Sequence, residues 1–266
     1  MMLATNFVLD DYLARIGFTG IPSVNPECLA QLMRCQLFSI PFENIDVRTH
    51  QAVSLVPEDL VNKLIYKNRG GYCYEVNGVF AMALDAIGFD YRICGARPMF
   101  YPSLRPKTHV VIIVEIGSER YLCDLGFGSF GIRAPIALSQ LDGILQQDDD
   151  QFRLSLLDEN TYLLEARVEQ AWKRQFAFDL YPMAWIDMGL PNYFNSTHPD
   201  TIFVQKTLAI RFSAQGRSIL VDNQLKRYRH GQVEITQVPS DEIVTLLQEE
   251  FHIDCPAGFV APGTAD

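Results

Sequence analysis

Two consecutive glycines, one tyrosine before a cysteine that opens a long apolar segment, constrain the fold of this chain more than any other feature. The stretch reads Asn68-Arg69-Gly70-Gly71-Tyr72-Cys73-Tyr74-Glu75. After it, apolar residues recur at helical spacing until the stop signal Gly88, at Val76, Val79, Phe80, Ala83, Leu84 and Ile87. The pattern predicts a buried amphipathic helix that begins near Cys73 and is entered through a tight turn, which the glycines permit.

A cysteine at the start of a helix is a candidate nucleophile. Unpaired N–H groups and the positive end of the helix dipole favour a thiolate there, and such a position can lower the pKa of a thiol from about 8.5 to roughly 3.5–7.5. The alternative is that Cys73 is an unreactive core residue, because free cysteines are usually buried. The local pattern leaves both interpretations open.

Composition excludes several classes of protein. The chain has 266 residues and a formal net charge of −10, which argues against a general nucleic-acid or membrane-surface binder but allows a local basic patch for an anionic cofactor. Its six cysteines lack Cys-x-x-Cys spacing, so neither a disulfide framework nor a metal site is expected. Because a basic N-terminal segment and an apolar run of about 18 residues are both missing, we expect no signal peptide, no membrane span and a cytoplasmic location. Nothing in the sequence indicates an oligomeric state.

Helical spacing in the first third of the chain and strand-like spacing after it predict an α+β fold. The predicted helices cover residues 10–16, residues 26–40 after an Asn25 N-cap, and a segment from Pro57. The predicted strands cover residues 91–97, 109–116, 120–125, 152–157, 161–168, 175–180, 204–212, 218–221, 224–228 and 232–238. They indicate a mostly antiparallel barrel or sandwich.

Three further segments have simple predictions. The acidic stretch 142–150 is predicted to be a solvated loop. Residues 181–201 show no clear period and are predicted to be irregular. Ser240 is predicted to cap a final helix that runs to Phe251.

The predicted hairpin brings a histidine and an aspartate onto one face. If Gly117-Ser118 forms its turn, Ile116 lies opposite Glu119, and Asp124 falls on the same face as His109. Diagonal neighbours across antiparallel strands lie roughly 7–8 Å apart, within side-chain reach. The hairpin can therefore hold His109 and Asp124 together, although either residue could instead have a purely structural role.

Cys73, His109 and Asp124 fit the roles of nucleophile, base and orienting acid. In this hypothesis His109 takes the thiol proton, and Asp124 fixes the tautomer and stabilises the charged ring. The corresponding reaction is acyl transfer through a thioester on sulfur. The other histidines lie in turns or at helix ends and do not compete.

Glycines and basic residues near this hairpin indicate ligand contacts. The run Gly126-Phe127-Gly128-Ser129-Phe130-Gly131 follows a strand but opens no helix, so it is not a dinucleotide fingerprint, although its N–H groups could bind an oxyanion. The loop before His109 carries Arg97, Arg105 and Lys107, which could bind the phosphates of an acyl carrier such as coenzyme A. A solvated loop explains these three cations equally well.

Four motifs occur in order along the chain: Ile40-Pro41-Phe42-Glu43-Asn44-Ile45-Asp46, Arg69-Gly70-Gly71-Tyr72-Cys73-Tyr74-Glu75-Val76-Asn77, Thr108-His109-Val110 and Asp124-Leu125-Gly126-Phe127-Gly128. The segment Asn195-Ser196-Thr197-His198-Pro199, followed by Phe203, fits the same pattern. Together these residues resemble the arylamine N-acetyltransferase family, and the resemblance extends over about the first 205 residues.

The resemblance implies three domains and a cysteine-protease-like triad arrangement. A helical bundle (residues 1–90) would carry Cys73, a central antiparallel β-barrel (residues 91–185) would carry His109 and Asp124, and an α/β lid (residues 186–266) would follow. It also implies a ping-pong reaction in which acetyl-coenzyme A acetylates Cys73, and the nitrogen of an arylamine, arylhydroxylamine or arylhydrazine then takes the acetyl group.

The resemblance further implies which residues meet the substrates. Phe38, Phe127 and Phe203 would line the acceptor pocket, with core packing as the alternative. Thr108, Gly126, Gly128 and Ser129 would contact coenzyme A. Glu43, Asn44 and Arg69 would hold the bundle to the triad through buried polar contacts.

Three other functions compete with this one. An amide synthase of the same family would use a carrier-bound polyketide as acyl donor. A hydrolase or transglutaminase-like enzyme would pass the acyl group to water or to a peptide amine. A binding module would keep the fold with an unreactive Cys73.

Overall fold

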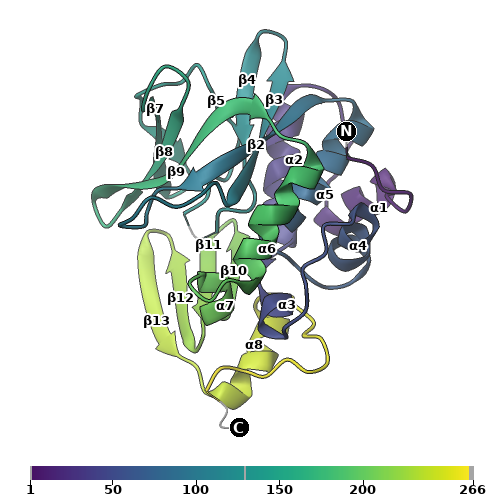
Figure 1. Cartoon of the computed structure of the whole chain (residues 1–266), viewed down its shortest axis with the longest axis vertical. Coiled ribbons are helices and arrows are strands. Elements are labelled where there is room, and N and C mark those ends of the chain that lie inside the picture. The colour runs from purple at the N-terminus through teal and green to yellow at the C-terminus, as the bar shows by residue number, and fades with distance from the viewer. Residues whose placement is uncertain (1, 129, 264–266) are drawn as a thin grey trace.

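The structure is a computed structural model that describes residues 2–128 and 130–263. In Figure 1 a curled sheet lies at the upper left, the N-terminal helices lie at the right, and a second sheet occupies the lower part of the molecule. One hydrophobic core joins the helices to the curled sheet, and a smaller one lies under the second sheet. Within the described part of the chain, every helix is too short or too polar to traverse a lipid bilayer.

The N-terminal part is helical, as predicted. It contains α1 (Leu9–Ile16), α2 (Pro26–Ser39), the short α3 (Ile45–Arg48), α4 (Pro57–Val61), which continues as the π-helical turn η1 (Asn62–Tyr66), and α5 (Cys73–Ile87). The side chain of Asn25 accepts the N–H of Cys28 at 2.8 Å, which confirms the predicted N-cap of α2. Gly88 ends α5 with a φ of 97°, a conformation that favours glycine.

The curled sheet is antiparallel and forms a half-barrel. Its strands are β2 (Asp90–Pro98), β3 (His109–Ile116), β4 (Glu119–Cys123), β5 (Ile136–Ala137), β6 (Leu145–Gln147), β7 (Asp150–Leu156), β8 (Tyr162–Val168) and β9 (Ala171–Pro182). They follow the order β5-β4-β3-β2-β9-β8-β7-β6, with β5 and β6 at the two edges. The sheet therefore curls without closing, so the half-barrel replaces the barrel expected from the sequence.

The second sheet contains one strand from the N-terminal part of the chain. Its order is β1 (Phe42–Glu43), β10 (Leu208–Ser213), β11 (Gly216–Val221), β12 (Gln224–Arg229) and β13 (Gln232–Gln237). The last helix, α8 (Ile243–Glu249), follows the turn η3 (Ser240–Glu242), and its Leu247 shares a core with Leu220 and Leu225 of the sheet. The pairing of β1 with β10 joins the N-terminal helical part of the chain to the second sheet.

The segment predicted to be irregular is helical. It contains η2 (Trp185–Met188) and α6 (Gly189–Thr197), and α7 (Ile202–Gln205) follows where the sequence predicted the start of a strand. The two buried residues of α6 are Asn192 and Asn195 rather than apolar ones. Because its buried face is polar, α6 lacks the hydrophobic period on which the prediction depended.

Two smaller predictions are also wrong. Ser240 does not cap the last helix, because its Oγ donates to the carbonyl of Pro262 at 2.7 Å. The acidic stretch 142–150 is not simply a solvated loop, because it contains β6, and two of its aspartates pair with arginines. Asp148 binds Arg34 and Arg133, and Asp150 binds the buried side chains of Arg133 and Arg217.

Candidate active site

Cys73 is the first residue of α5 and is only 3% exposed. Two glycines allow the backbone to pack closely around it. A Cβ on Gly70 would lie 2.0 Å from the carbonyl oxygen of Pro41, and a Cβ on Gly126 would lie 2.4 Å from the Cα of Cys73. Both positions therefore have room for glycine alone, and at Gly70 this agrees with the predicted tight turn before Cys73.

The hairpin places His109 beside Asp124 as the sequence predicted. Ile116 lies opposite Glu119 across the two-residue turn, and the Nε2 of His109 lies 2.8 Å from the Oδ2 of Asp124. Both side chains are buried, with 4% of His109 and 1% of Asp124 exposed. The imidazole is also held by ring contacts with Phe127 and Phe176, each at 5.1 Å between centroids.

Asn77 links the cysteine helix to the hairpin, a role that the sequence analysis missed. Its Nδ2 donates to the carbonyl of Val110 at 3.0 Å and lies 3.3 Å from the Oδ1 of Asp124, and its Oδ1 accepts the N–H of Leu125 at 3.0 Å. Asn77 lies one turn of α5 after Cys73, so it faces the same side of the helix. The sequence feature that could have indicated this role is a polar amide side chain on the apolar face of a buried helix.

Burial raises the pKa of the Cys73 thiol, and the nearby Asp124 carboxylate raises it further. The N–H of Tyr74 at the start of α5 acts in the opposite direction, as expected of a helix N-terminus, but it does not outweigh burial. The predicted lowering of this pKa is therefore wrong. A thiolate at Cys73 needs a positive charge beside it, such as a protonated imidazole.

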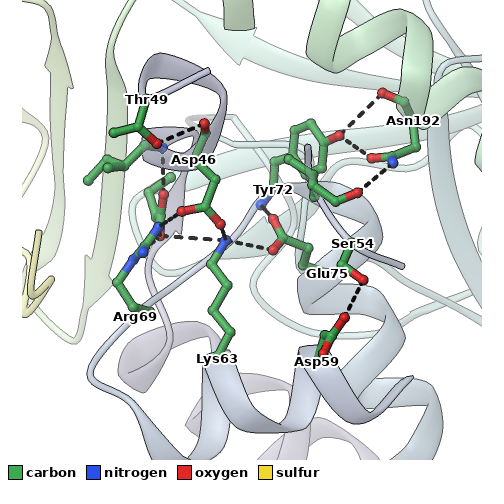
Figure 2. Close-up of polar contacts among 12 residues, drawn as sticks. Asp46, Thr49, Ser54, Asp59, Lys63, Arg69, Tyr72, Glu75 and Asn192 are labelled. Carbon is green, nitrogen blue, oxygen red and sulfur yellow. Dashed lines mark hydrogen bonds and ion pairs between the residues drawn. The ribbon is translucent and has the colours of Figure 1, made fainter. Parts of the chain in front are cut away.

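A buried ionic cluster supports the turn that carries Cys73 (Figure 2). Lys63 lies 2.6 Å from both Asp46 and Glu75, and Arg69 lies 2.6 Å from Asp46 and 2.7 Å from Glu43. The Oε2 of Glu75 accepts the N–H of Tyr72 at 3.0 Å, which fixes the residue before the cysteine.

Glu43, Asn44 and Arg69 make polar contacts with buried side chains, as expected, but Asn44 joins the bundle to the segment before β10 rather than to the triad. Asn44 binds the carbonyls of Phe203 and Lys206, each at 2.7 Å. In the ionic cluster, the carboxylates of Glu43, Asp46 and Glu75 face two cations. Burial raises the pKa of Glu75 to about 7, with a smaller opposing effect from Lys63.

Cys73 and His109 line the same cavity, which has a volume of about 440 Å³. One wall is the loop between β2 and β3, a second comes from α6 and α7, and a third is formed by Leu208, Ile210, Ile219 and Val221 of the second sheet. The resemblance implied one residue of the α6–α7 wall, Phe203. The second-sheet wall was not expected from the sequence, because its residues lie far along the chain from Cys73. The lining is mostly aromatic and aliphatic, as is usual for a small-molecule site.

Most of the predicted substrate contacts meet at this cavity. Phe127, Phe203, Thr108, Gly126 and Gly128 all line it. The structure does not bring Phe38 there, since that ring packs on the core with the guanidinium of Arg34 4.5 Å from its centroid. Ser129 lies outside the described residues.

Within residues 2–128 and 130–263, no group of three or more His, Cys, Asp and Glu side chains is placed to hold a metal ion. What the site does hold is a buried cysteine at a helix N-terminus and a bonded histidine–aspartate pair on one apolar cavity. This arrangement is typical of enzymes that use a cysteine as nucleophile.

Comparison with known proteins identifies the family to which the chain belongs. A profile described as N-acetyltransferase matches residues 26–260. The arylamine N-acetyltransferase / N-hydroxyarylamine O-acetyltransferase of Salmonella typhimurium is 34% identical over 239 residues, covering 87% of this chain and 83% of that protein. The Escherichia coli arylamine N-acetyltransferase is 31% identical and covers 95% of this chain and 92% of its own length.

Solved structures agree with the sequence matches. The Salmonella typhimurium enzyme superposes with a TM-score of 0.88 at 31% identity, covering 92% of this chain and 91% of that one. The Mycobacterium marinum enzyme, solved in complex with CoA, gives a TM-score of 0.87 at 28% identity and covers 93% of each chain. The chain belongs to the arylamine N-acetyltransferase family.

Proposed function

We propose that the chain transfers the acetyl group of acetyl-coenzyme A to the nitrogen of an arylamine, arylhydroxylamine or arylhydrazine through a thioester on Cys73. The observation that carries the proposal is the meeting of Cys73 with the bonded pair His109–Asp124 on one apolar cavity, in a member of this family. The CoA complex of the Mycobacterium marinum relative supports coenzyme A as the carrier.

In the first half-reaction, His109 takes the proton of Cys73. Because its Nε2 is bonded to Asp124, the Nδ1 is the ring nitrogen that accepts this proton, and the Asp124 carboxylate stabilises the imidazolium. The resulting ion pair overcomes the burial that opposes a lone thiolate. The thiolate attacks the acetyl carbonyl, the bond from that carbon to the coenzyme A sulfur breaks, and the proton on His109 goes to the departing thiolate.

In the second half-reaction, the amine nitrogen attacks the Cys73 thioester. The C–N bond forms, the C–S bond to Cys73 breaks, and the proton lost by the nitrogen passes through His109 to the sulfur. The apolar cavity suits this step because an aromatic acceptor packs against Phe127 and Phe203 while water is kept from the thioester.

The remaining assignments rest on the same cavity and on the family. Thr108, Gly126 and Gly128 contact coenzyme A, because all three line the cavity and the glycines let a ligand approach the backbone. The second sheet and α8 act as the lid over the half-barrel. The domain divisions near residues 90 and 185, the contact by Ser129 and the role of Phe38 stay predictions, as does the cytoplasmic location, which the six free cysteines support.

The test is intact mass after the purified protein is mixed with acetyl-coenzyme A in the absence of any amine. We expect one added acetyl group that maps to Cys73 and is removed when an aniline or a hydrazide is supplied. An adduct-free Cys73 that still reacts with iodoacetamide would indicate another acyl donor, as in an amide synthase or a hydrolase. An adduct-free and unreactive Cys73 would indicate a binding module.

A further inference from the structure

The catalytic cavity has two cationic residues on its wall that no carboxylate of the described residues neutralises. They are Arg105, in the loop between β2 and β3, and Lys173, in β9, and neither forms an ion pair within residues 2–128 and 130–263. Among the described residues that line the cavity, the one acidic side chain is that of Asp200, which is exposed and lies 4.0 Å from the Nδ1 of His198. An anion that enters the cavity therefore meets unpaired positive charge.

The structure separates Arg105 from the two other cations of its loop. Lys107 pairs with Asp179 of β9, so its positive charge is already neutralised. Arg97 donates to the backbone carbonyl of Arg105 and thereby holds the loop in place. Of the three basic residues that the sequence marked as possible phosphate ligands, only Arg105 combines a position on the cavity with an unpaired charge.

A continuous row of rings connects the candidate base to Arg105. His109 contacts Phe127 at 5.1 Å, Phe127 contacts Phe100 at 5.8 Å, and Phe100 contacts Tyr101 at 4.2 Å, all between ring centroids. The guanidinium carbon of Arg105 lies 4.7 Å from the centroid of Tyr101. The rings are inclined to one another, with neighbouring pairs at 71°, 78° and 33°, and together they line an apolar path that begins at the candidate base and ends at a cation.

The polar atoms of Arg105 are only partly satisfied. Its Nε is buried and has no hydrogen-bond partner among the described residues. A buried N–H without a partner is costly, and a guanidinium binds planar oxyanions through two parallel hydrogen bonds. A carboxylate or phosphate at this point would satisfy the donor.

We propose that Arg105, assisted by Lys173, binds an oxyanion that a substrate carries at a distance from its reacting atom. This inference rests on the proposed function. In a ping-pong reaction the donor and the acceptor occupy the cavity in turn, so the oxyanion is either a carboxylate on the ring of an acidic arylamine or a phosphate of coenzyme A. In both cases Arg105 is a specificity-determining residue that leaves the chemistry at Cys73 to the other groups.

The experiment compares matched substrates in each half-reaction for the wild-type enzyme and the Arg105→Ala variant. For the acceptor, the ratio of kcat/KM for 4-aminobenzoate to that for its methyl ester isolates the carboxylate. For the donor, the ratio of the Cys73 acetylation rate with acetyl-coenzyme A to that with 4-nitrophenyl acetate isolates the phosphates. General damage to the site cancels in both ratios.

We expect Arg105→Ala to lower one of these ratios about tenfold or more, since a charge-assisted hydrogen bond is lost. A fall in the acceptor ratio identifies the ring carboxylate, and a fall in the donor ratio identifies the phosphate. Lys173→Ala should lower the same ratio by a smaller factor, and Arg105→Lys should recover part of it.

Lys107→Ala is the matched control, because it removes one positive charge from the same loop at a site that is already paired. Ratios for Arg105→Ala that are unchanged, or changed only as much as in this control, overturn the inference. If the wild-type enzyme is not acetylated by either donor, the proposed function fails instead, so the two failures are distinguishable.

Discussion

Cys73 lies between two regions, the N-terminal helices and the cavity, that are held together by different kinds of interaction. On the side of the helices, the turn is held by a buried network in which Lys63 and Arg69 bind three carboxylates, and Glu75 binds the N–H next to the cysteine. On the side of the cavity, the walls are mainly aromatic and aliphatic side chains from distant parts of the chain. Ionic and polar bonds therefore hold the residues around Cys73 on the helix side, whereas mainly apolar side chains line the cavity on the other side.

The largest effect is expected at the sulfur itself. Cys73→Ser should reduce turnover by at least about three orders of magnitude, because a serine hydroxyl is a far weaker nucleophile in the same position. The change is nearly isosteric, so the melting temperature should stay close to that of the wild type. Steady-state rates and the intact mass after mixing with acetyl-coenzyme A measure the effect. Retained turnover in Cys73→Ser would show that Cys73 is not the nucleophile.

A loss of about 10⁴-fold in kcat is expected for Asp124→Asn, because the amide no longer fixes the tautomer or stabilises the charged imidazole. A second variant, Asn77→Ala, removes the link between α5 and the hairpin without touching the imidazole. It should cost less than Asp124→Asn. Equal losses in the two variants would mean that Asp124 acts only by positioning.

The close packing of Gly126, which follows the hairpin, against the start of α5 can be tested with Gly126→Ala. The added methyl group would lie 2.4 Å from the Cα of Cys73, so the hairpin and the helix must move apart. We expect a loss of about 1–3 kcal/mol in the free energy of unfolding, together with a large loss of activity. Gly143→Ala is the control, because its Cβ would meet nothing within 4 Å. Similar stabilities for the two variants would contradict the close contact.

The smallest effect concerns the pH dependence of stability. Burial raises the pKa of Glu75 from 4.5 to about 7 in the folded protein. The folded state therefore binds more protons than the unfolded state between these values, so the contribution of Glu75 to stability falls as the pH rises from about 4.5 to 7. Glu75→Gln should remove this dependence.

Urea unfolding at several pH values across that range checks the prediction. The stability of the wild type should fall relative to Glu75→Gln by about 2–3 kcal/mol. The variant keeps an oxygen that can accept the N–H of Tyr72, so the cap itself is preserved. Parallel curves for the two proteins would show that Glu75 is ionised throughout.

The sequence predicted those parts of the site that depend on local rules. The helix at Cys73 was predicted from the period of its apolar residues and from Gly88, and the contact between His109 and Asp124 was predicted from the parity of a hairpin with a two-residue turn. Both rules involve residues close together in the chain. They needed no knowledge of tertiary packing.

What the sequence did not predict depends on contacts between distant residues. The wall formed by Ile210 and Ile219, the binding of Asp150 by Arg217 and the polar burial of α6 all require partners that a local pattern cannot identify. The pKa of Cys73 is a similar case. The helix N-terminus is visible in the sequence, whereas the degree of burial that outweighs it is set by the whole fold.

Because β1 pairs with β10, the second sheet can form only after the ribosome has synthesised residues 208–213. Asn44, which follows β1, binds the N–H of Leu208, 164 positions later. At typical translation rates the ribosome needs roughly 10–30 s to cover that stretch. A nascent chain therefore carries Cys73, His109 and Asp124 well before the β10 and β11 side of the cavity exists. A C-terminal truncation that falls after Asp124 and before Leu208 should yield a chain with every candidate catalytic group but without the second-sheet wall of the cavity.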